Sequence, residues 1–134
     1  MGSTAIALIG FAGWYTLLSV ALAGYRVRFI LAGTKAANTF TNDGEDLGGL
    51  GHRLTRARNN CFETIGLFAA IALGASLAGR LDLTDPLAMW VLYARIGQSI
   101  THVVSTSVPA VLLRANLFFA QMIIYLWWTV HLLG

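Results

Sequence analysis

Four long apolar blocks dominate this sequence and constrain its fold more than any other feature. They occupy residues 4–25, 56–79, 86–108 and 114–133. The hydrocarbon layer of a bilayer is about 30 Å thick and a helix rises about 1.5 Å per residue, so each block predicts a helix that crosses a membrane. Only 11% of the residues are charged, whereas a soluble domain has about 25%. The sequence therefore predicts an all-α integral membrane protein, a single domain built as a bundle of four transmembrane helices.

Basic residues gather at one end of the predicted bundle. The polar loop over residues 26–55, its flanks and the link before the fourth block contain the following: Arg26, Arg28, Lys35, Arg53, Arg56, Arg58 and Arg114. The link at the opposite end has only one basic residue, Arg80. Because cytoplasmic loops are enriched in Lys and Arg, we expect the first and third loops in the cytoplasm and both termini outside.

Polar side chains recur along one face of each of the last three predicted helices. The second helix has Arg56, Asn60 and Glu63, the third has Arg95, Gln98, Ser99 and His102, and the fourth has Arg114, Gln121 and Tyr125. Spacings of three and four residues place side chains on one helical face. Such faces cannot meet lipid, so we expect them to face one another or a neighbouring subunit and to line a wet, positively charged pocket.

Glu63 and Arg95 are the only full charges well inside the spans, so we expect them to pair. This pair either only joins the second and third helices, or Glu63 also binds a cationic ligand group. Arg56 and Arg114 favour anion binding, because the planar guanidinium suits a carboxylate. The alternative for the basic residues at this end is topology signalling or contact with lipid headgroups. His102 is either a packing residue or a ligand-binding one.

Other kinds of site have little support in the sequence. No pair of histidines has metal-ligand spacing, so we expect no metal. The glycines at 48–51 follow no predicted strand and precede no Gly-Lys-Ser/Thr, which argues against a phosphate-binding loop. Nor do we expect a nucleic-acid partner. The single cysteine, Cys61, is read as a small buried side chain.

The string RARNNCFETIGLF at residues 56–68 resembles the second-helix signature of the membrane-associated proteins in eicosanoid and glutathione metabolism, the MAPEG family. The matching positions are Arg56-Ala57, Asn60 and Glu63, and the continuation through Ile65 is most similar to the microsomal prostaglandin E synthase branch. Chain length, four spans, a long basic first loop and the arginine at position 95 also match. The resemblance covers essentially the whole chain.

This resemblance implies a homotrimer with glutathione bound between subunits near the cytoplasmic face. Arg56, Asn60 and Glu63 would hold glutathione, and Arg95 would support Glu63. Either Arg26 or Arg28 would match an arginine at the end of the first helix, and His102 stands where a tyrosine helps to bind glutathione. Arg114 would match an arginine that opens the fourth helix near the glutathione thiol, and is the predicted catalytic residue.

Two positions near Arg114 depart from the family pattern. Phe118 replaces a tyrosine, and Ala115 replaces the serine of the prostaglandin branch. Glutathione binding is therefore better supported than any named reaction. The first functional hypothesis is a glutathione transferase, with peroxidase activity as a second reaction, acting on lipophilic electrophiles. The alternatives are a non-catalytic lipid-binding or scaffold protein on the same fold and a small four-helix transporter.

Assembly follows from the polar faces. A closed oligomer would bury them between subunits, with the second helix near the symmetry axis, and the resemblance sets the number of subunits at three. We expect each site to draw Arg56, Asn60 and Glu63 from one chain. Arg114 or a first-helix arginine would come from the next chain.

Overall fold

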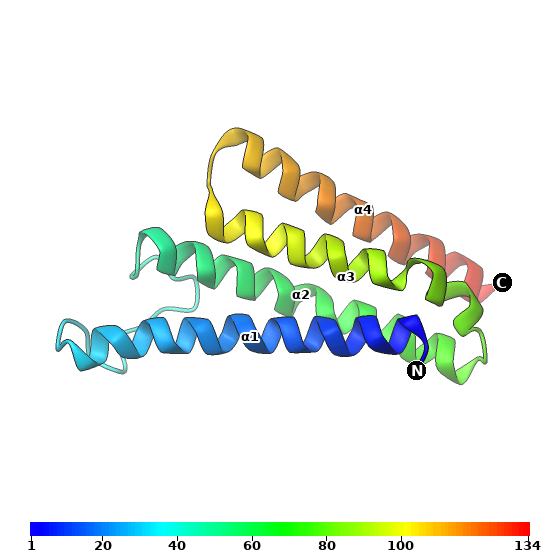
Figure 1. The fold of residues 1–134 in the computed structure, drawn as a ribbon, viewed down its shortest axis with the longest axis horizontal. Coiled ribbons are helices and arrows are strands. Elements are labelled where there is room, and N and C mark those ends of the chain that lie inside the picture. The colour runs from blue at the N-terminus through cyan, green and yellow to red at the C-terminus, as the bar shows by residue number, and fades with distance from the viewer.

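The computed structural model describes residues 1–134 as four α-helices without a strand. They are α1 (Ser3–Leu31), α2 (Gly49–Leu77), α3 (Leu81–Val104) and α4 (Val108–Leu133). The helices run up and down along a common direction, with both termini at one end and the first and third loops at the other (Figure 1). The two loops that carry most of the basic residues therefore share one end of the bundle, opposite the termini.

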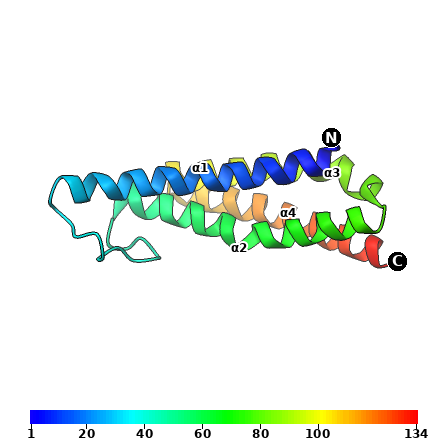
Figure 2. The same cartoon turned by 90° about the horizontal axis from the view of Figure 1, so that it is seen from below.

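Three of the helices, α1, α2 and α4, are long and apolar enough to cross a membrane. The remaining helix, α3, packs against each of the other three, whereas α1 and α4 are not neighbours. In the view of Figure 2, α1 and α2 lie in front and α3 and α4 lie behind them. The polar side chains of α3, including Arg95, Gln98 and His102, are buried. Its lower hydropathy thus comes from residues that point into the bundle rather than toward lipid.

The helices extend beyond the apolar blocks. α1 continues to Leu31 and α2 begins at Gly49, so the connecting loop covers 32–48 rather than 26–55. Arginine is a good helix former, which allows the helices to continue past the apolar residues. α4 begins at Val108, not near residue 114, because Pro109 lies in its first turn rather than closing the preceding helix. Arg114 is consequently well inside α4.

The start of α3 also differs from the sequence prediction. The helix begins at Leu81 rather than at residue 86, so Pro86 lies inside it. Asp85 lies near the start of α3, but its carboxylate serves α1. Its Oδ1 accepts hydrogen bonds from the backbone N–H (2.8 Å) and the hydroxyl (2.6 Å) of Thr4. The carboxylate thereby satisfies a free N–H in the first turn of α1 and ties the two helices together.

Aromatic side chains fill the middle of the bundle. Phe68 of α2 stacks against Tyr125 and Trp128 of α4, with ring centroids 6.0 and 5.9 Å away. Phe11 of α1 contacts the same ring at 6.1 Å. The cluster joins α1, α2 and α4, and it lies between the polar residues and the end of the bundle where the termini are. It thereby fixes the positions of these helices relative to one another next to the site.

Candidate functional site

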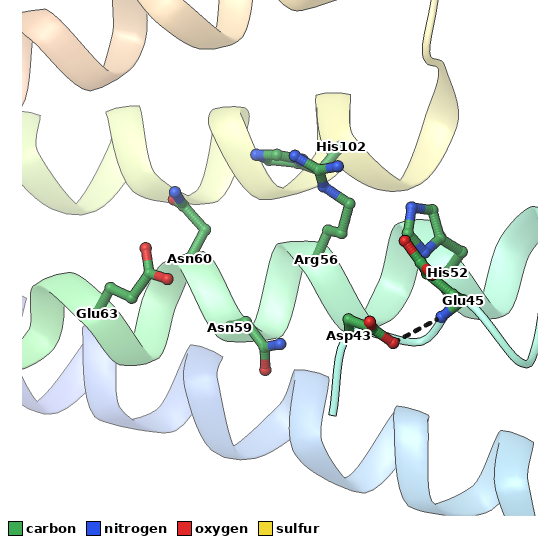
Figure 3. A pocket seen from close by; sticks show the side chains of 8 residues that line it. All are labelled: Asp43, Glu45, His52, Arg56, Asn59, Asn60, Glu63 and His102. Atoms are coloured by element: carbon green, nitrogen blue, oxygen red, sulfur yellow. Dashed lines mark hydrogen bonds between the residues drawn. The ribbon is translucent and has the colours of Figure 1, made fainter. Parts of the chain in front are cut away.

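A polar hollow of about 280 Å³ opens between α2, α3 and the first loop (Figure 3). No apolar residue lines it. Its walls are Asp43, Glu45, His52, Arg56, Asn59, Asn60, Glu63 and His102. The three residues predicted on one face of α2 are therefore together, and His102 of α3 faces them across the hollow. Arg56 and Glu63 are exposed and Asn60 is half-buried.

A chain of hydrogen bonds fixes the orientation of the Asn60 amide. Gln121 of α4 donates from Nε2 to the carbonyl oxygen of Leu117 (2.9 Å) and to Oε1 of Gln98 (3.0 Å). Since both partners are acceptors, the Gln121 NH₂ group must face them. Gln98 then has its own NH₂ toward Asn60 and donates to Oδ1 at 3.0 Å.

Arg95 completes this arrangement at the other side of Asn60. Its Nη1 also donates to Asn60 Oδ1, and an arginine can only donate. With Oδ1 taken by two donors, the Asn60 NH₂ is the group left for a ligand. Asn60 thus presents hydrogen-bond donors to the hollow.

The expected pairing of Glu63 with Arg95 is wrong within the chain. Arg95 is fully buried, bonds Asn60, and lies 5.3 Å from the ring centroid of Phe11. The only ion pairs in the structure are Lys35–Asp46 and Arg80–Asp82. One helical turn separates Asn60 from Glu63, and the arginine meets the nearer, more buried amide. Glu63 consequently forms no ion pair within the chain.

His102 and Arg114 interact directly across α3 and α4. Arg114 Nη1 lies 2.9 Å from His102 Nδ1. Because the guanidinium donates, Nδ1 accepts and the histidine proton resides on Nε2. The structure is consistent with both interpretations of His102, because its side chain is buried between helices and also borders the hollow where a ligand could bind.

A second hollow, also about 280 Å³, adjoins the first and shares Asn60, Glu63 and His102 with it. Gln98 and Arg114 contribute further polar groups. The rest of its wall comes from α4 and is mainly apolar: Val111, Ala115, Phe118 and Phe119. Arg114 thus stands where the polar pocket meets an apolar surface. It does so beside Asn60 and Glu63 of its own chain, without a neighbouring subunit.

The acidic loop residues Asp43 and Glu45 were not predicted to belong to the site. Gly44 between them has φ of 74°, and a Cβ there would come within 2.6 Å of Thr55 Cβ, so only glycine lets the loop lie on α2. Asn59 helps to hold the loop by donating to the Asn42 carbonyl oxygen at 2.7 Å. The Asn-Asp-Gly sequence is a turn signal that could have indicated this fold-back.

The charge of the pocket also differs from the prediction. Three carboxylates, from Asp43, Glu45 and Glu63, border the first hollow beside a single arginine, Arg56. A hydrogen bond from the Thr41 hydroxyl lowers the pKa of Asp43, so this carboxylate stays ionised. The site therefore offers both signs of charge rather than a positive surface, because the loop brings its acids onto the basic face of α2.

Neither first-helix arginine reaches this site within one chain. Arg26 donates to the Thr41 carbonyl oxygen at 3.2 Å and borders a different cavity. Arg28 is exposed and lies against Tyr25 and Phe29.

The motif on α2, its polar partners on α3 and α4 and the bundle itself agree with one family. The sequence model of the MAPEG family matches residues 4–134, essentially the whole chain. The chain belongs to the MAPEG family. No curated protein and no solved structure matches it.

Membership in the MAPEG family makes this an integral membrane protein of a broadly glutathione-related group. Arg56, Asn60 and Glu63, the residues of α2 on which the sequence resemblance rests, all border the same hollow. Gln98 borders the second hollow and donates to Asn60, whereas Gln121 borders neither hollow and acts on Asn60 through its hydrogen bond to Gln98. The sequence predicted Gln98 and Gln121 on the polar faces of their helices, but only the tertiary structure shows that the two side chains are hydrogen-bonded to each other.

Proposed function

We propose that this MAPEG protein is a membrane-bound transferase that conjugates glutathione to lipophilic electrophiles. One observation carries the proposal: adjoining hollows present carboxylates, arginines and an apolar wall together. Glutathione carries one ammonium group and two carboxylates, so a site with charges of both signs fits it. An apolar wall on α4 beside Arg114 suits a substrate that arrives through the bilayer.

The site residues divide by charge. Glu63 and the loop acid Asp43 suit the ammonium group, while Arg56 suits a carboxylate through its planar fork. The Asn60 NH₂ donates to a carboxylate or carbonyl oxygen of the peptide. Arg95 acts through Asn60, and His102 acts through Arg114.

Arg114 is the proposed catalytic residue. A thiol is a weak nucleophile, and a nearby guanidinium favours the thiolate. The thiol proton leaves to solvent, and the thiolate sulfur then forms a bond to an electrophilic carbon while that carbon's leaving group departs with its electron pair. His102 holds one guanidinium nitrogen, and the remaining N–H groups stay free for the sulfur. Peroxide reduction is the second reaction to test, since it needs the same thiolate.

A homotrimer forms part of this proposal, and exposed features of α2 support an oligomer. Arg56 and Glu63 are charged and exposed on a spanning helix, so they require a neighbour or water. Gly66, Ala70 and Gly74 are also exposed, four residues apart, and nothing lies within 4 Å of either glycine's Cβ position. Small residues with this spacing favour close helix contact in lipid. The number three comes from the family.

The test is a thiolate difference spectrum of purified protein in detergent with glutathione. We expect a thiolate absorbance in the wild type, and its loss in Arg114→Ala without loss of the oligomer. Arg80→Ala removes an arginine at the opposite end of the bundle and should leave the signal intact. Absence of both a thiolate signal and conjugation to a general aromatic electrophile in the wild type would reject the enzyme proposal.

A non-catalytic lipid-binding or scaffold protein is the second candidate. Ala115 and Phe118 favour it, because both line the hollow beside Arg114 and neither has a hydroxyl. Calorimetry with glutathione separates the two candidates. A scaffold would leave glutathione unbound, whereas the proposed transferase binds it saturably.

A further inference from the structure

A separate cavity of about 500 Å³ lies between the C-terminal half of α1, α2 and the first loop. Arg26 and Arg58 border it, together with the polar side chains of Ser19 and Asn38. Its volume falls within the range of about 300–1,000 Å³ that is typical of ligand sites. None of these residues borders either hollow of the glutathione site.

Both arginines in this cavity lack a carboxylate partner. Arg26 uses Nη2 for the Thr41 carbonyl oxygen, and its buried Nε has no acceptor at all. Arg58 donates from Nη1 to Asn59 Oδ1 at 3.0 Å and reaches Ser19 Oγ only at 3.5 Å. Two guanidinium groups with unused donors on one cavity favour an anion, above all a phosphate or carboxylate.

The other wall of the cavity is apolar and belongs to a spanning helix. Leu22, Ala23 and Ile30 of α1 line it, and α1 is apolar enough to cross a membrane. The arginines lie near the loop end of that helix, where headgroups of the lipid are expected. A ligand with an anionic head and an apolar tail matches both walls, and basic pockets between spanning helices are suited to anionic lipid heads.

We propose that this cavity binds an anionic phospholipid, with the phosphate between Arg26 and Arg58 and an acyl chain along Leu22 and Ile30. The site is distinct from the proposed glutathione site and does not depend on it. Bound lipid would brace the first loop, because Arg26 also holds the loop through Thr41.

The test is lipid retention by the full-length protein in mild detergent, measured by native mass spectrometry. Phosphatidylglycerol and phosphatidylcholine with matched chains are the probes. We expect phosphatidylglycerol to bind about tenfold more tightly, and the double variant Arg26→Gln/Arg58→Gln to lose this preference. Arg28→Gln removes the same charge from the same end of α1 without touching the cavity, so it should retain the preference.

Further arms of the experiment guard against misfolding and identify the source of the anion. Ala23→Trp fills the cavity while leaving both arginines, and should also abolish retention. Saturating glutathione should not displace the lipid, nor should inorganic phosphate. Equal binding of the two lipids, equal loss in Arg28→Gln, or displacement by either soluble anion would overturn the proposal.

Discussion

Asn60 shows how a single side chain acquires a defined chemical role. An amide can present either a donor or an acceptor to a ligand, and the sequence does not say which. Here Oδ1 accepts from both Arg95 and Gln98, which leaves the NH₂ for the hollow. A buried arginine without a carboxylate is costly, and at this site its donors set the direction of the amide.

Asn60→Asp should separate ligand binding from stability. The new carboxylate still accepts from Arg95 and Gln98, and gains a charge pair with the arginine, so the melting temperature should not fall. The donor to the ligand is lost, and a hydrogen bond to a charged group contributes about 1.5–3 kcal/mol. We expect glutathione affinity to fall about 10- to 100-fold, as measured by calorimetry.

Asn42→Asp is the matched control, since it makes the same chemical change in an exposed loop residue that does not line the hollow. Its affinity should equal that of the wild type. Undiminished affinity in Asn60→Asp would show that the amide does not donate to the peptide.

At the scale of elements, the hydrogen-bonded amides join α2, α3 and α4 into one unit. Gln121 lies on α4, Gln98 on α3 and Asn60 on α2, and each contact crosses from one helix to the next. Amphipathic spacing predicted that these faces would meet, but it paired Arg95 with the wrong acceptor. Charge alone favoured Glu63, whereas the packing of α3 on α2 brings Arg95 to Asn60.

Gln121→Met should weaken glutathione binding although Gln121 does not line either hollow. Gln98 Oε1 loses its donor, and a buried acceptor left unsatisfied costs about 1–3 kcal/mol of unfolding free energy. The Gln98 amide is then free to turn, which leaves Arg95 as the one donor that orients Asn60, so the Asn60 amide is held less firmly. Thermal unfolding and calorimetry on the same sample measure the two effects.

Thr129→Val is the control for this prediction. It also removes one polar group from α4, but the hydroxyl of Thr129 donates to the Tyr125 carbonyl oxygen and takes no part in the chain of amide hydrogen bonds. Gln98→Met combined with Gln121→Met should be less harmful than the sum of the single changes. Strict additivity would contradict a connected chain of amides.

At the scale of the whole molecule, the structure bears on which subunit supplies each residue of the site. Arg114 lies beside Asn60 and Glu63 of its own chain, so a neighbour is not needed to supply it. Of the two first-helix arginines, Arg26 is engaged with the first loop, and Arg28 is exposed. For the proposed trimer we therefore propose Arg28, rather than Arg26, as the arginine that would serve the site of the next subunit.

Oligomers assembled from two different variants test whether Arg114 and Arg28 act within their own chain's site or in the site of the next subunit. Chains with Glu63→Ala mixed with chains with Arg114→Ala should recover no conjugating activity, because both side chains belong to one chain's site. Glu63→Ala mixed with Arg28→Ala should recover about a quarter of the sites in a randomly assembled ring. Recovery in the first mixture would place Arg114 in the neighbouring subunit's site.

The sequence by itself determined the helical membrane bundle, the placement of the basic loops at one end and the polar face of α2. These properties follow from block length, charge distribution and spacing along a single helix, all of which are local. Tertiary structure alone decided that Arg95 meets Asn60 and that Asp85 caps α1. Each of these depends on the register between segments distant in the chain, and that register is set by packing, which no local pattern encodes.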